Sequence, residues 1–145
     1  MKYMQQKTVL LDLSDLKNPT CGFGQIALNY ARLFSEIQLP DIRFVLLLPK
    51  GYNGETLEKK VECHYVKRKK KNSYKDVPHV DIWHSVNQNQ IYNNARNDTK
   101  LVITIHDLNF LREKGWMSQM KHRWRIRKQL RQADQVTAIS QFVAD

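Results

Sequence analysis

The chain has 145 residues, of which 41% are hydrophobic and 26% are charged. This size and balance fit one globular domain with its own core, and they exclude a wholly disordered chain. No stretch approaches the roughly 18 apolar residues that a transmembrane helix requires, and the opening residues, MKYMQQK, lack the apolar core of a signal peptide. We therefore expect a cytoplasmic protein.

The net charge is +10, from 24 Lys and Arg against 14 Asp and Glu. Two segments hold this excess. One is KRKKK at 67–71, and the other is 112–131, which carries eight basic side chains and one acidic side chain. Such clustering predicts a basic patch that faces anionic material, with nucleic acid, anionic lipid and phosphorylated substrates as candidates.

The first half of the chain alternates between strand and helix patterns. Apolar and β-branched runs predict strands, helical spacing of apolar residues predicts helices, and clusters of turn formers predict loops. The expected elements, in order, are a strand at 8–13, a loop at 14–24, a helix at 25–37, a strand at 43–49, a short helix at 55–60 and a strand at 61–66.

The second half continues the alternation after a basic loop at 67–75 and ends on a helix start. The expected elements are a strand at 80–83, a polar segment at 87–98, a strand at 101–105, a basic helix at 116–132, a strand at 135–139 and a last helix capped by Ser140. Strands that alternate with helices predict a Rossmann-like α/β fold, with a parallel sheet and helices on both faces. The chain is expected to be one such domain and a fragment of a longer protein.

In open parallel sheets, ligands bind beyond the carboxyl ends of the strands. Three places meet this condition: the loop around Gly22, the segment that begins at His84, and the pair His106 and Asp107. We expect these places to gather at one edge of the sheet.

The loop sequence GFGQIA at 22–27 matches G-x-G-x-x-A, a pattern that holds phosphate on backbone N–H groups at the start of a helix. Two features disfavour NAD. Several loop residues separate the first strand from the glycines, and the expected acid after the second strand is replaced by Pro49 and Lys50. A non-dinucleotide phosphate or sugar site is favoured, and a loop that needs glycine only to enter a helix is the alternative.

Histidine at a strand end can donate to or accept from a sugar hydroxyl, and aspartate can accept from a hydroxyl or orient the ring. We expect the imidazole of His106 to reach into a cleft and to contribute little core volume, while a structural histidine is the alternative. His84 is equally consistent with ligand contact and with a structural role. No HExxH, CxxC or G-x-S-x-G spacing occurs, so neither a metal ion nor a serine hydrolase is expected.

Three segments in this order resemble a known family: Cys21–Phe34, Asp81–Leu111 and Ala133–Asp145. They are similar to the N-terminal domain of retaining GT-B glycosyltransferases of family 4, which has a glycine loop, a strand ending in His-Asp, and an AD-x-x-x-A-x-S passage. Such enzymes move a sugar from a nucleotide-sugar donor to an acceptor without a metal or another bound cofactor. The resemblance implies a glycan or lipid-linked acceptor and a role in cell-surface polysaccharide synthesis.

The resemblance also implies site residues. Gly22, Gly24 and Gln25 would approach the donor diphosphate or the acceptor, and His106 would bind a donor-sugar hydroxyl. The acceptor side would be lined by Asp107 and by the segment Asn87–Gln90, with His84 nearby. The catalytic residues are expected in a C-terminal donor-binding domain that the chain lacks, because no two glutamates here stand eight positions apart. The chain alone is therefore expected to be inactive.

The basic helix suggests a surface for anionic lipid, placed at the inner face of the membrane. Trp116 and Trp124 accompany its charged side chains, although the arginines fall on most sides of the helical wheel. The helix carries Lys121, Arg123, Arg125, Arg127, Lys128 and Arg131, and the four assigned to this surface are Arg123, Arg125, Arg127 and Lys128. The alternative is a solvated basic helix packed through Leu130 and Ala133. Two rival functions are a nucleic-acid-binding module, although the signatures of such modules are absent, and a small NAD- or flavin-binding domain.

Overall fold

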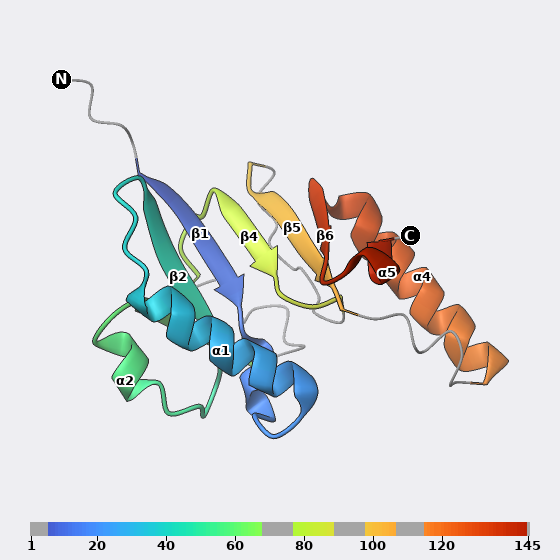
Figure 1. The fold of residues 1–145 in the computed structure, drawn as a ribbon, viewed down its shortest axis with the longest axis horizontal. Coiled ribbons are helices and arrows are strands. Elements are labelled where there is room, and N and C mark those ends of the chain that lie inside the picture. Colours follow the sequence, from blue (N-terminus) through green and yellow to red (C-terminus); the bar gives the residue numbers. More distant parts are fainter. Residues whose placement is uncertain (1–5, 68–76, 89–97, 107–114, 145) are drawn as a thin grey trace.

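The computed structural model describes residues 6–67, 77–88, 98–106 and 115–144 (Figure 1). A six-stranded sheet forms its centre, with the order β3-β2-β1-β4-β5-β6, and every adjacent pair is parallel. The strands are β1 (Lys7–Asp12), β2 (Ile42–Pro49), β3 (Glu62–Val66), β4 (Ile82–Ser85), β5 (Lys100–Ile105) and β6 (Gln135–Ala138).

Helices occupy the connections between these strands. They are the 3₁₀ turn η1 (Ser14–Lys17) and the α-helices α1 (Gly22–Glu36), α2 (Glu55–Glu58), α4 (Trp116–Gln132) and α5 (Gln141–Ala144). In Figure 1, α1 and α2 lie over the half of the sheet formed by β1–β3, and α4 and α5 lie beside β6. The predicted Rossmann-like α/β fold is confirmed. In the described ranges, no helix has the length and apolar character needed to cross a bilayer.

The central strands of the sheet are buried on both faces, whereas the residues of the edge strand β6 are exposed. In β2, the four residues from Val45 to Leu48 are all 0% exposed, which confirms the prediction of a strand covered on both sides. Alternate side chains enter two clusters. Leu47 packs with Leu10 and Trp83 on one face, and Leu46 packs with Leu11 and the small residues of α1 on the other.

The order in which successive strands are added to the sheet changes direction between β1 and β4. The chain moves outward from β1 through β2 to β3, returns to the far side of β1, and then moves outward again through β5 to β6. The carboxyl ends of β1 and β4 therefore lie at a topological switch point, the place where open α/β sheets form ligand sites.

Two elements begin two or more residues away from the predicted start. Helix α1 begins at Gly22 instead of Gln25, and the turn η1 lies within the expected loop. Strand β4 covers Ile82–Ser85 instead of 80–83. Although Val80 is buried, its carbonyl oxygen accepts the hydroxyl of Thr99 at 2.9 Å and it lies outside the strand ladder. The polar residues His84 and Ser85 take part in the ladder instead.

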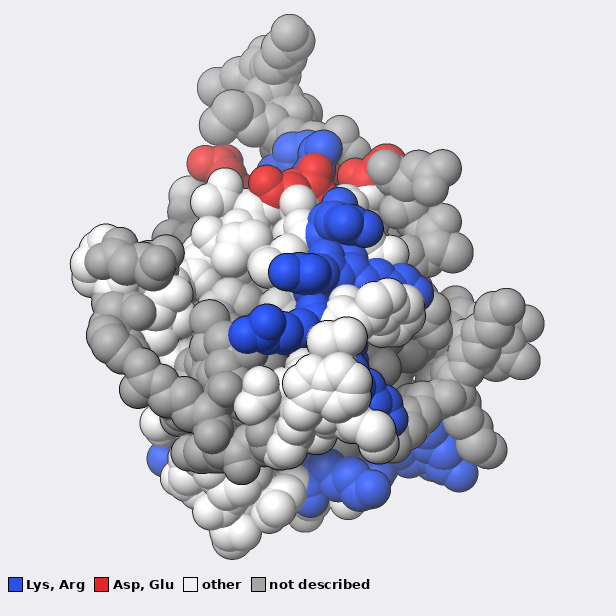
Figure 2. All heavy atoms as spheres, turned by 90° about the vertical axis from the view of Figure 1, so that its right-hand side faces the viewer, with Lys and Arg blue, Asp and Glu red and all other residues white. Residues whose placement is uncertain are grey.

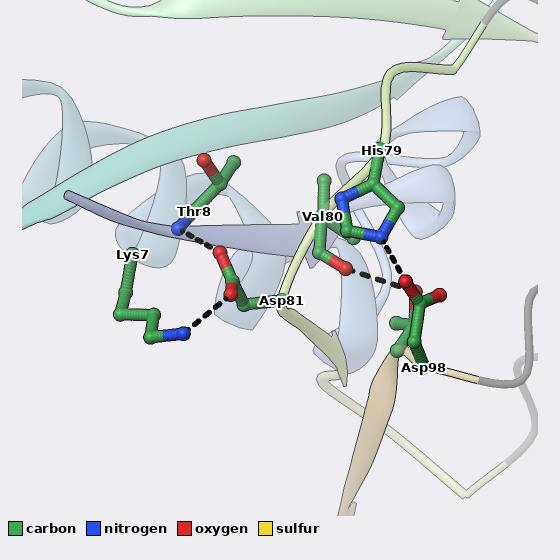
Figure 3. A network of polar contacts seen from close by, with 7 residues as sticks. Lys7, Thr8, His79, Val80, Asp81 and Asp98 are labelled. Carbon is green, nitrogen blue, oxygen red and sulfur yellow. Dashed lines mark hydrogen bonds and ion pairs between the residues drawn. The ribbon is translucent and has the colours of Figure 1, made fainter. Parts of the chain in front are cut away.

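One aspartate, Asp81, joins β1 and β4 by hydrogen bonds at their amino-terminal ends (Figure 3). The Oδ2 atom of Asp81 accepts the N–H of Thr8 at 2.8 Å, and its own N–H donates to the carbonyl oxygen of Thr8 at 3.0 Å. The ammonium of Lys7 donates to Oδ1 at 2.8 Å. These hydrogen bonds from Lys7 and Thr8 hold the pKa of Asp81 below its usual value.

A second aspartate repeats the arrangement at the β5–β6 pair. Asp134 accepts the N–H of Leu101 at 2.9 Å and the ammonium of Lys100 at 2.8 Å, and its N–H donates to the carbonyl oxygen of Leu101 at 2.9 Å. The N–H of Lys100 also donates to the carbonyl oxygen of Asp81 at 2.9 Å, which joins the two arrangements. The AD at the start of Ala133–Asp145 therefore has a structural role at the edge opposite the candidate site.

We predict that Asp81→Asn lowers the melting temperature by roughly 3 °C at neutral pH, because a charge-assisted hydrogen bond contributes about 1 kcal/mol. A carboxylate with a lowered native pKa stabilises the fold above its unfolded pKa, and this contribution is lost as the pH falls through the native pKa. Thermal unfolding at about pH 7 and about pH 3 should therefore show a difference between wild type and variant that becomes smaller in acid. Asp41→Asn, at an exposed carboxylate, is the control. An equal loss in the control would contradict the assignment.

Candidate functional site

The candidate site lies at the carboxyl ends of β1, β4 and β5. His106 follows β5 directly, and its imidazole is held against the chain that leaves β4. Nε2 lies 2.6 Å from the carbonyl oxygen of Val86, and the His106 N–H donates to Oε1 of Gln88 at 3.0 Å. The ring meets Phe23 of α1 edge-on, with 5.4 Å between the ring centroids. The glycine loop and His106 are thus neighbours, as the sequence predicts.

The imidazole of His106 is more enclosed than the sequence suggests. The residue is only 6% exposed, so the expectation of a side chain that adds little core volume is wrong. The reason is its packing between Phe23 and the residues that follow β4. A His106→Ala variant would therefore leave a cavity and a carbonyl group without its donor.

The second nitrogen of the His106 ring, Nδ1, differs from Nε2 in its hydrogen bonding. A carbonyl oxygen can only accept, so Nε2 carries a proton, and in the neutral form of the ring Nδ1 is an acceptor. Nδ1 is buried and has no hydrogen-bond partner within the described residues. The hydroxyl of Ser85, opposite Asp12 at the switch point, is likewise buried and unpaired in the part of the chain that the structure describes. Such atoms are rare in native proteins and mark places where a further partner fits.

The two glycines of the loop have different roles. At Gly24, an added Cβ would lie 1.9 Å from the carbonyl oxygen of Asn18, so glycine is required there by the protein's own packing. At Gly22, an added Cβ would meet nothing within 4 Å, and the residue is exposed. The open space at the start of α1 is therefore beside Gly22, where N–H groups of the first turn can receive an anion or a hydroxyl.

Local contacts hold the glycine loop in this shape. Cys21 caps α1, because its Sγ accepts the N–H of Gly24 at 3.4 Å and donates to the carbonyl oxygen of Asn18 at 3.1 Å. The side-chain amide of Gln25 turns back and donates to the carbonyl oxygen of Pro19. Gln25 thus holds the loop in this structure, although the sequence suggested it as a substrate contact.

His84 lies beneath α1, one strand away from His106. Its Nε2 is 2.8 Å from the hydroxyl of Thr104, and its ring meets Tyr30 edge-on at 6.2 Å between centroids. Burial is the main cause that lowers the pKa of His84 below 6.5, and repulsion from the His106 ring when that ring is protonated is the second cause. These contacts favour a structural role for His84 as a neutral ring in the wall behind the site.

Asn87 connects the segment that follows β4 to the turn η1. It is 2% exposed, and its side-chain amide donates to Oδ2 of Asp15 in η1. Asp107 and positions 89–90, which the sequence assigns to the acceptor side, lie outside the described residues. Sequence analysis missed Phe23, whose ring packs against His106, although its place between the two glycines was an available signal. It placed Gln88 on the acceptor side, within Asn87–Gln90, whereas the structure shows the Gln88 side chain bound to the backbone of His106.

The four basic residues assigned to an anionic surface all lie on α4, at a distance from His106 along the chain. Arg123, Arg127 and Lys128 are exposed, whereas Arg125 is partly buried and its guanidinium donates to Nδ1 of His122 at 3.3 Å. Figure 2 shows this side of the molecule, with Lys and Arg side chains across its centre and acidic side chains at its upper rim. The basic surface therefore belongs to α4, whereas the candidate site is formed by the ends of β1, β4 and β5 and the start of α1.

A hollow of about 630 Å³ lies near the amino-terminal ends of β2 and β3 and is lined in part by Phe34, Ile42 and Lys60. It is at the wrong edge of the sheet for a site of this fold class. In the described ranges, no three His, Cys, Asp or Glu side chains come together as metal ligands would.

Comparisons with protein-family models, with curated proteins and with solved structures found no match to this chain. Function is therefore inferred from the site itself and from the resemblance of its sequence segments.

The glycine pair provides a direct test of the site. Gly24→Ala should destabilise the protein by about 1–3 kcal/mol, because a backbone oxygen occupies the space of the new methyl group. Gly22→Ala should change stability by less than about 0.5 kcal/mol, yet weaken binding of any ligand that sits on the first turn of α1. Denaturant unfolding measures the first effect. Equal destabilisation by the two variants would contradict the assigned roles.

The environment of His84 predicts a pH effect. A histidine with a lowered native pKa resists protonation in the folded state, so stability should fall as the pH drops below 6.5 toward the native pKa. Denaturant unfolding at about pH 7 and about pH 5 measures this fall. His84→Gln should reduce the dependence, because the titrating ring is gone. An unchanged pH dependence in that variant would assign the effect to other groups.

Proposed function

We propose that this chain is the N-terminal, acceptor-side domain of a retaining GT-B glycosyltransferase. In this role it helps to move a sugar from a nucleotide-sugar to a glycan or lipid-linked acceptor during the synthesis of cell-surface polysaccharide. The observation that carries the proposal is the contact of Phe23, next to Gly22 at the open start of α1, with the buried ring of His106. This combination offers backbone donors for phosphate or hydroxyl groups beside a fixed imidazole acceptor.

The geometry also favours this function over dinucleotide binding. In the dinucleotide fingerprint, the second glycine lets the pyrophosphate approach the backbone closely. Here the corresponding residue, Gly24, faces the carbonyl oxygen of Asn18, which fills the place of that approach. The turn η1 and the loop before α1 also separate the glycines from β1.

His106 would act by accepting a hydroxyl proton in a hydrogen bond. The contact between Nε2 and Val86 fixes both the tautomer and the direction of the ring, so Nδ1 is preorganised as the acceptor. A sugar hydroxyl that donates to Nδ1 would also satisfy an atom that is unpaired in the described part of the chain. Enclosure of this contact makes it stronger than it would be in water.

The proposal requires a donor-binding domain with a nucleotide pocket and the glutamate pair, which these 145 residues do not contain. The coding sequence that follows Asp145 is therefore the most informative observation. Two glutamates eight positions apart, about a hundred or more residues further on, would support a glycosyltransferase whose first domain is described here. Measurable sugar transfer by the 145-residue chain alone would contradict this division of roles.

Ligand titrations separate the proposed function from its rivals. Nucleotide-sugars added to the labelled chain should shift the amide signals of Gly22 and Phe23, with weak affinity, because only half of the site is present. Stronger thermal protection by NAD or a flavin nucleotide would favour a nucleotide cofactor domain. Salt-dependent binding of random oligonucleotides, without any shift at Gly22, would favour a nucleic-acid module.

A substitution at His106 tests the proposal most directly. It should be made in the enzyme that includes the donor-binding domain. His106→Gln keeps a donor near the position of Nε2 but removes the Nδ1 acceptor. It should lower transfer roughly 10- to 100-fold, as expected for a hydrogen bond of about 1–3 kcal/mol that tightens in the transition state.

His106→Asn is the matched control, because its amide lies near Nδ1 and no longer reaches Val86. It should lower the melting temperature more than His106→Gln does, while retaining more transfer for each folded molecule. The reverse order of activities would assign His106 to the scaffold.

A further inference from the structure

The outer face of α4 carries large apolar side chains that the protein leaves in water. Trp116 is 73% exposed, Met117 76%, Met120 55% and Trp124 67%. Their spacing places them on one side of the helix, whereas Ile126, on the other side, is buried. We call these four residues the Trp-Met stripe. Single exposed apolar residues are common, but a continuous stripe of this size marks a binding surface.

Positive charge surrounds the Trp-Met stripe. The helix contains six basic and no acidic residues, namely Lys121, Arg123, Arg125, Arg127, Lys128 and Arg131. Within the described ranges, no carboxylate forms an ion pair with Lys121, Arg123, Arg127 or Lys128. The charge of these side chains is therefore available to an external partner.

We propose that the Trp-Met stripe and its basic border dock α4 on the surface of an anionic phospholipid membrane. Tryptophan is favoured at the boundary between headgroups and acyl chains, and methionine adds apolar area there. Lysine and arginine on the border extend to the lipid phosphates while their stems cover apolar surface. The combination of both features on one face is what an interfacial helix requires.

The alternative partner with the same charge preference is single-stranded nucleic acid, which stacks its bases on exposed aromatic rings. Two observations favour lipid. The ammonium of Lys128 lies 5.6 Å from the centroid of Trp124 and occupies one face of that ring. Met117 and Met120 share the stripe with the tryptophans and add apolar side chains that have no flat face for a base.

Docking would bring the candidate site to the membrane. α4 ends where Asp134 binds Leu101, at the start of β5, so the helix runs antiparallel to the strands. Its first turn, at Trp116, therefore lies toward the edge where the strands end (Figure 1). If the proposed function holds, an acceptor carried on a lipid would reach His106 from the same membrane.

Vesicle binding tests the proposal without reference to sugar transfer. The purified chain should sediment with vesicles in which about a third of the lipid is phosphatidylglycerol, but not with pure phosphatidylcholine, and added salt should weaken the binding. Tryptophan emission should shift to the blue and become protected from iodide, because Trp116 and Trp124 are exposed before binding whereas Trp83 is already buried.

Variants separate the contributions of apolar and charged groups. Trp116→Ser with Met117→Ser should abolish the emission shift and most of the binding. Arg127→Gln with Lys128→Gln should lower the affinity for anionic vesicles roughly tenfold or more. Lys17→Gln with Lys50→Gln, which removes the same charge from exposed sites elsewhere, should change it little. All variants should keep the wild-type melting temperature, because the altered side chains are exposed.

Three binding results would overturn the proposal. The first is equal binding to neutral and anionic vesicles. The second is a loss of affinity in the Lys17 and Lys50 control as large as that in the Arg127 and Lys128 variant. The third is binding of oligonucleotides that vesicles do not displace. Concentration-dependent dimerisation abolished by the Trp116 and Met117 variant would likewise assign the stripe to a second copy of the chain. Failure of the proposed glycosyltransferase function would leave the vesicle result unchanged, so the two are tested separately.

Discussion

Two aspartates fix the register of the sheet, and the candidate site depends on that register. Asp81 and Asp134 each bind both backbone groups of one residue on the neighbouring strand and also bind the lysine before it. β4 has only four residues, so its position at one end determines which residue emerges at the other. A slip of one residue would turn every side chain of the strand to the opposite face. The placement of His84, Ser85 and Val86 follows from contacts made at the far edge.

At the carboxyl edge, most polar groups are engaged in holding the site together. Asn87 binds Asp15, Gln25 binds the loop, and Gln88 binds the backbone of His106. This network fixes the His106 imidazole, whose second nitrogen is buried without a partner among the described residues. Preorganised groups of this kind need little rearrangement when a ligand arrives, which is why supporting contacts matter as much as the contacts to the ligand.

Sequence analysis was correct for elements whose structure follows from the residues of the segment itself. The basic helix was predicted with its observed limits, and the buried run in β2 was recognised because four consecutive aliphatic residues need cover on both faces. It misplaced β4 because His84 and Ser85 are polar residues in a buried strand, which a hydrophobic pattern cannot reveal. The contact of Asn87 with Asp15 joins residues 72 positions apart and depends on the topology. The different roles of Gly22 and Gly24 also depend on where Asn18 lies, so the shared glycine pattern could not separate them.

The strand order has a consequence for how the protein is made. β1 is synthesised first, yet it lies inside the sheet, and its second neighbour, β4, comes more than sixty residues later in the chain. While the ribosome produces the intervening segment, β1, β2 and β3 can assemble with α1, but one edge of β1 stays open. An open apolar edge invites pairing with other nascent chains. Arrival of Asp81 beside Lys7 and Thr8 closes this edge, so the same contact that sets the register also ends the interval in which the emerging chain is most exposed to misassembly.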